Sequence, residues 1–102
     1  MSFYQRLATE TADERAGLLG TPIIQGCLQG QVSLPSYQAF LREAFHHVRH
    51  TVPLLQACQQ ALPARHAWLR GPLDEYIEEE QGHELWILDD IRACGADAEA
   101  VR

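Results

Sequence analysis

The sequence predicts an all-α fold of about four to five helices arranged as a bundle, and three observations support this class. Val, Ile and Thr nowhere alternate with polar residues over the length of a strand. Apolar residues instead recur at the 3.6-residue spacing of amphipathic helices throughout the chain. Capping residues, prolines and glycines divide the chain where helices begin and end. The length of 102 residues suits one domain, and we expect a single all-helical domain over residues 1–102.

Local signals delimit the first two helices. Ser2 and Gln5 form a capping-box pair for a helix that extends to about Leu19, where a glycine follows. The pair Thr21-Pro22 then supplies an N-cap and a proline at the first helical position. We expect the short helix that begins there to end near Gly30.

The third helix is long and contains a proline. It begins at Ser33 or Ser36 and runs to about Leu62. Pro53 lies in its interior, where the missing N–H removes a hydrogen bond and the ring clashes with the preceding turn. We therefore expect a kink at this proline.

The C-terminal part contains a short and a long helix. A short helical turn covers residues 65–69, and Gly71-Pro72 begins a long helix that Gly95 ends. The stretch 95–102 has the pattern of a loop followed by the start of another helix. We therefore expect the chain to be a piece of a longer protein whose missing helices would cover its apolar faces, so that the piece alone associates or folds weakly.

Composition excludes several classes of protein. Apolar residues make up 46 % and charged residues 22 %, as in soluble globular domains. Eight arginines, no lysine and fourteen acidic residues give a net charge of −6, which argues against nucleic acid as a partner. No apolar run approaches the ~18 residues of a membrane span, and no signal segment follows Met1. Because Cys27, Cys58 and Cys94 include no CxxC pair, we expect reduced core cysteines in a cytoplasmic protein.

Glu80 lies in the middle of the apolar stripe of the last helix. At ~100° per residue, Leu73 and Ile91 lie within about 20° of it, whereas Glu78 points the opposite way. A buried carboxylate needs an ion-pair partner, a hydrogen bond or a metal. Glu80 and His83 form an i, i+3 pair whose side chains can converge on one ion, and Glu-x-x-His is the ligand module of di-iron carboxylate bundles.

The third helix carries a similar face. Its acidic and imidazole side chains cluster on one side, together with apolar neighbours: Glu43, His46, His47, His50, Ala39, Phe40 and Leu54. A second apolar stripe occupies another side and includes Tyr37, Leu41, Phe45 and Val48. Only Gln38, Arg42, Arg49 and Gln56 remain as a solvent face. We therefore expect this helix to pack on two sides, with Glu43 and His50 facing the same interior cavity as Glu80 and His83.

Structural explanations for these residues stay open at this stage. Glu80 ends the run Glu78–Glu80, and such runs are usually solvated. A single histidine on an apolar face is more often a hydrogen-bonded core residue than a ligand, and we assign no role to His66. Gly82 costs about 1 kcal/mol in a helix interior. Close approach of another helix is the explanation that we give for it.

The residues around Glu80 resemble a known group of proteins. The stretch 76–86, YIEEEQGHELW, followed by Asp89-Asp90 and by ACGAD at 93–97, is similar to a helix of the heme-oxygenase-like superfamily. That superfamily includes TenA-like (thiaminase II) and PqqC-like proteins. The branch that the sequence resembles most is the iron-containing redox enzymes, or heme-oxygenase-like di-iron oxidases. The stretch 45–53, FHHVRHTVP, fits the same group, and the resemblance extends from about Phe3 to Asp97.

The resemblance implies a bundle about twice this length, of which the chain forms the N-terminal half. It implies that Glu80 and His83 are iron ligands. It also implies that a further Glu and a His/Asp/His set on helices beyond residue 102 complete a di-iron site. The region in which TenA-type enzymes keep a catalytic cysteine and glutamate would likewise lie beyond this chain, so the sequence identifies no catalytic residue.

Three functional hypotheses follow. The first is an oxidoreductase in which Glu80 and His83 hold Fe(II) that activates dioxygen and oxidises a small organic substrate. The residues that would line its pocket or support the ligands are Glu43, His46, His47, His50, Phe40 and Tyr76. The second is a ferritin-like bundle with Glu14 as a bridging carboxylate, which the proline-interrupted helices disfavour. The third is a TenA-like ligand-binding or regulatory protein without metal. None of the three needs a membrane or nucleic acid, and a homodimer is compatible with each.

Overall fold

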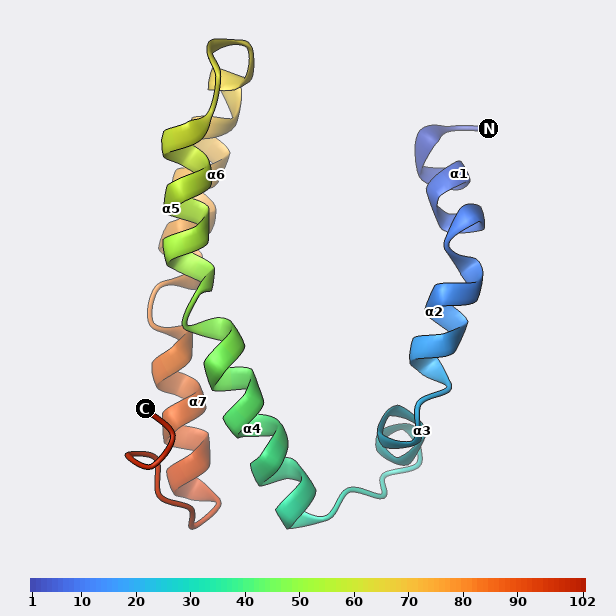
Figure 1. Cartoon of the computed structure of the whole chain (residues 1–102), viewed down its shortest axis with the longest axis vertical. Helices are drawn as coiled ribbons and strands as arrows, with labels where there is room; N and C mark the ends of the chain where they lie inside the picture. Colours follow the sequence, from blue (N-terminus) through green and yellow to red (C-terminus); the bar gives the residue numbers. More distant parts are fainter. The chain divides into compact units, whose positions relative to one another are not determined.

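A computed structural model describes residues 1–102, and its only regular structure is helical, which confirms the all-α class. The chain forms two compact units, residues 1–33 and 34–102, where the sequence predicts one domain. The first unit contains α1 (Phe3–Glu10), α2 (Ala12–Leu19) and α3 (Pro22–Leu28). The second contains α4 (Leu34–Val48), α5 (Thr51–Ala61), the 3-10 helix η1 (Ala64–Leu69), α6 (Arg70–Glu80) and α7 (His83–Ala93) (Figure 1). Three of the predicted helices are thus each broken once.

The first break lies at Thr11. The predicted capping box is present: the Ser2 hydroxyl accepts from the Gln5 N–H, and the Gln5 side chain accepts from the Ser2 N–H. At Thr11 the hydroxyl donates to the Leu7 carbonyl at 2.7 Å, a bond to the preceding turn that bends helices. The Arg15 guanidinium donates to the Ala8 carbonyl. The Leu7 carbonyl thus accepts from both the hydroxyl and the N–H of Thr11, whereas the Ala8 carbonyl accepts from a side chain at the break.

The first unit buries none of its side chains. None of the residues of α1, α2 or α3 is buried. The exposed large apolar side chains of this unit are Met1, Phe3, Tyr4, Leu7, Leu18, Leu19, Ile23, Leu28 and Val32. The unit therefore lacks the apolar burial that supplies most of the stabilisation of a folded domain.

The second unit is an antiparallel helical hairpin whose two arms are each interrupted near the middle. Helix α4 packs on α7, and α5 packs on α6 (Figure 1). The break between α4 and α5 falls at residues 49–50, several residues before the kink that the sequence predicts at Pro53. Pro53 cannot donate to the carbonyl of Arg49, and its ring displaces that carbonyl. As the third residue of a new helix, Pro53 occupies a position whose N–H has no intrahelical partner in any case.

The core of the hairpin lies between α4 and α7. Leu41 and Phe45 of α4 meet Leu88 and Ile91 of α7, and all four are at most 6 % exposed. The Gln38 side-chain amide donates to the Cys94 carbonyl at 2.8 Å, so this residue joins the two helices instead of lying on the predicted solvent face. One stripe of α4 is therefore buried where the sequence predicts two.

The C-terminal segment also departs from the sequence prediction. Residues 96–101 form a turn, not the start of a further helix, and they return to the core, where Ala98 and Val101 are buried. The Asp97 carboxylate accepts from the Glu99 N–H at 2.9 Å, which stabilises this turn.

The other half of the hairpin is held by polar contacts. The Gln59 amide of α5 donates to the Asp74 carboxylate at 2.6 Å and to the Arg70 carbonyl at 3.1 Å.

All three cysteines are free, but Cys27 and Cys58 are exposed, so the prediction that they are core residues is wrong. Helix lengths and hydropathy leave no helix that could cross a membrane.

Replacing Leu88 with Ala should destabilise the hairpin. The side chain is 1 % exposed, and removing a fully buried leucine costs about 2–5 kcal/mol of unfolding free energy. Leu85→Ala on the same helix, at a residue that is 48 % exposed, is the matched control and should cost less than about 1 kcal/mol. Urea unfolding followed by circular dichroism measures both. Equal effects of the two substitutions would contradict the described core.

Candidate metal centre

The segment between α6 and α7 is a type II turn. Gln81 has φ −60° and ψ 124°, and Gly82 has φ 86° and ψ 0°, which are the angles of the two central residues of such a turn. The sequence predicts one continuous helix here, and that prediction is wrong. Nothing lies within 4 Å of the place where a Cβ of Gly82 would be, so close packing does not explain the glycine either. Its positive φ does, because side chains with a Cβ disfavour that region.

The turn brings a carboxylate and an imidazole together at its two ends. His83 Nδ1 lies 2.9 Å from Glu80 Oε2. The two side chains are half-buried, at 22 % exposure for Glu80 and 29 % for His83, whereas Glu78 and Glu79 are exposed. The i, i+3 pairing expected from helical spacing thus forms through a turn.

A hydrogen bond joins the two side chains, and their donor atoms are also of the types that bind metal ions. Divalent first-row ions bind imidazole nitrogen and carboxylate oxygen at about 2.1 Å, so two ligand atoms at a right angle to one another lie about 3 Å apart. The observed 2.9 Å between His83 Nδ1 and Glu80 Oε2 matches this separation. No group of three or more His, Cys, Asp or Glu side chains that could hold a metal occurs in the chain. The Glu80–His83 pair is therefore not by itself a metal site within these 102 residues.

An aromatic contact completes the surroundings of His83. The ring centroids of His83 and Trp86 are 4.4 Å apart, and the rings are tilted by 34°. Trp86 is not among the site residues that the sequence predicts. The signal that could have indicated it is the i, i+3 spacing of two rings in the first turn of α7.

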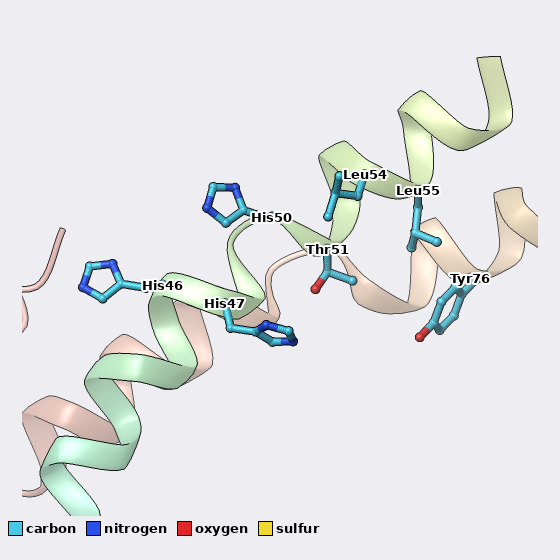
Figure 2. A pocket seen from close by; sticks show the side chains of 7 residues that line it. All are labelled: His46, His47, His50, Thr51, Leu54, Leu55 and Tyr76. Atoms are coloured by element: carbon cyan, nitrogen blue, oxygen red, sulfur yellow. The ribbon is translucent and has the colours of Figure 1, made fainter. Parts of the chain in front are cut away.

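A separate pocket of about 650 Å³ lies where α4, α5 and α6 meet. Its lining consists of His46, His47, His50, Thr51, Leu54, Leu55 and Tyr76. Figure 2 shows Tyr76 reaching in from α6, and the ring of His47 turned the opposite way from those of His46 and His50. His50 Nε2 accepts from the Arg49 guanidinium at 3.4 Å. The pocket thus combines imidazole and phenol groups with leucine side chains.

Other predicted site residues lie elsewhere. The pocket lining includes neither Glu43 nor Phe40, and both are exposed on α4. Nor does it include Glu80 or His83, so this pocket is not the single cavity predicted for Glu43, His50 and this pair. The reason is that α4 turns its Leu41 stripe toward α7, which leaves the Glu43 side uncovered. Glu14 is exposed on α2 and belongs to no metal-binding group.

The second unit is an all-helical hairpin with a carboxylate–imidazole pair at the junction of α6 and α7. The model of one family, described as iron-containing redox enzyme, matches residues 38–102, which is more than half of the chain and includes the whole pair. The chain therefore belongs to the family of iron-containing redox enzymes, and the resemblance to the heme-oxygenase-like superfamily is confirmed. Comparison with curated proteins and with solved structures gave no match.

Replacing Gly82 with Ala should strain the turn. An L-residue at a φ of 86° costs about 1–2 kcal/mol, which lowers the free energy of unfolding by that amount or forces the turn to change. Gly71→Ala is the matched control, because Gly71 lies in α6 without positive φ and without neighbours near a Cβ. There the change should be neutral or stabilising. Denaturant titration of both variants measures the change in the free energy of unfolding. A Gly82→Ala protein as stable as the wild type would refute the positive φ of Gly82.

Proposed function

We propose that this chain is part of a non-heme iron oxidoreductase to which it supplies Glu80 and His83 as iron ligands. The proposed reaction is the oxidation of a small organic substrate by dioxygen. The observation that carries the proposal is the 2.9 Å approach of His83 Nδ1 to Glu80 Oε2 in a half-buried turn of a chain from the iron-containing redox enzyme family. Mixed carboxylate and imidazole ligation with open positions is typical of non-heme Fe(II) sites that use dioxygen.

The proposed centre contains two irons. Bound Fe(II) would supply electrons for the reduction of dioxygen. Glu80 brings a negative charge that offsets part of the charge of the ions. Its carboxylate would hold iron together with the His83 imidazole, which lies 2.9 Å from Glu80 Oε2. The remaining ligands come from outside these 102 residues, since no third ligand-type side chain gathers with the pair.

The histidine-lined pocket is the proposed contact region for the substrate. Tyr76 lies four residues before Glu80 on α6, so pocket and ligand pair share one side of this helix. Leu54 and Leu55 offer apolar contacts to an organic molecule. The imidazole nitrogens of His46, His47 and His50 offer hydrogen-bond partners to polar groups of such a molecule. We place the reaction in the cytoplasm, in keeping with three unpaired cysteines.

One observation favours a second candidate function. The pocket lining does not include Glu80 or His83. A TenA-like ligand-binding or regulatory protein would use the pocket alone and bind no metal. Metal binding distinguishes the two candidates.

Substitution of either ligand should remove iron. After anaerobic Fe(II) reconstitution of the whole protein, which includes the remaining ligands, Glu80→Gln and His83→Asn should each lower bound iron by at least about tenfold, since even supporting residues around metal ligands contribute that much. Exposure to oxygen should produce a transient optical change in the wild type and none in these variants. Iron analysis and stopped-flow absorbance measure the two effects.

The control substitutions are Glu78→Gln and His66→Asn. Glu78 is exposed on α6, and His66 lies in η1, outside both the pair and the pocket. Both variants should bind iron as the wild type does. If the wild-type protein binds no iron, or if the Glu80 and His83 variants still bind it, the proposed iron ligands are wrong. The metal-free candidate function would then be favoured.

A further inference from the structure

We infer that Trp86 is a positioning residue that holds the His83 imidazole in the orientation required for metal binding. The indole lies on His83 with a ring-centroid distance of 4.4 Å. The inference rests on the proposed function, because it concerns the orientation of His83 as a metal ligand. Two residues, Glu80 and Trp86, contact the His83 ring.

The imidazole needs such a constraint. The terminal torsion of a histidine is broad, so the ring orientation is not set by rotamer preference alone. The Glu80 carboxylate contacts the ring edge at Nδ1 and places nothing against the ring face. Trp86 contacts the ring face, and the two contacts together define one orientation.

The backbone places the indole where it can act. Gly82 O accepts from the N–H groups of Leu85 and Trp86, at 3.0 and 3.4 Å, which forms the first turn of α7. Side chains on a helix lean toward the preceding turn, so Trp86 covers His83 one turn earlier. The glycine turn, the ligand and the indole thus form one continuous local structure.

Core packing does not account for Trp86. The residue is 64 % exposed and lies outside the buried cluster of the hairpin. Its described ring contact is with His83. An indole face also attracts positive charge more strongly than a phenyl face does, so it favours an imidazole that shares the charge of a metal ion.

The test compares iron affinity in variants of the two tryptophans. Trp86→Ala should raise the dissociation constant for Fe(II) about tenfold, and Trp86→Phe should raise it less because a ring face is kept. The matched control is Trp68→Ala, since Trp68 is 70 % exposed in η1, and this variant should keep the wild-type constant. Competition with a coloured chelator under nitrogen measures the constants.

Two spectroscopic measurements complete the test. In Trp68→Phe protein all indole emission comes from Trp86, and Fe(II) should quench it, whereas His83→Asn should abolish the quenching. Without metal, the indole should shift the His83 ring protons upfield in the NMR spectrum, and Trp86→Ala should remove this shift.

The outcomes separate the inference from the proposed function. If the wild type binds Fe(II) and Trp86→Ala binds it equally well, the positioning role is wrong and the ligand assignment stands. If the wild type binds no Fe(II), the proposed function and the metal-positioning role both fail. An absent ring-current shift in the wild type would overturn the ring contact itself.

Discussion

Gly82 adopts a backbone conformation that residues with a side chain enter only at a cost, and much of the second unit depends on it. Its φ of 86° completes a type II turn that ends α6 and begins α7. The turn places Glu80 and His83 at its two ends, and it starts the helix that carries Leu88 and Ile91 to the core. One glycine therefore links the geometry of the ligand pair to the packing of the hairpin.

The interruptions in the two arms of the hairpin have a common consequence. Because α4 packs on α7 and α5 on α6, the α4–α5 and α6–α7 junctions face each other across the hairpin. One junction carries His50 and the other carries the Glu80–His83 pair. Polar side chains at helix interruptions can bind ligands without breaking a regular apolar interface. The apolar core is correspondingly displaced toward the α4–α7 half.

The sequence predicts the helical class, the capping box at Ser2 and the approach of Glu80 to His83, because each depends on local spacing. The sequence-based predictions are wrong where the structure depends on long-range contacts or on backbone angles. The sequence predicts a helix interior at Gly82 because the apolar periodicity continues across it. In the structure a turn with two central residues, Gln81 and Gly82, separates α6 from α7. Helical spacing places Glu43 and His50 on one face. In the structure α4 packs on α7 through its Leu41 stripe, and Glu43 is exposed. The spacing of residues along the sequence predicts neither the turn at Gly82 nor the side of α4 that packs.

The central claim is that Glu80 and His83 bind iron together. Crystals of the iron-loaded protein, measured on both sides of the iron absorption edge, test it most directly. The account predicts an anomalous peak about 2.1 Å from both His83 Nδ1 and a Glu80 carboxylate oxygen. A peak elsewhere, or a Glu80–His83 pair that stays hydrogen-bonded with no iron beside it, would contradict the account.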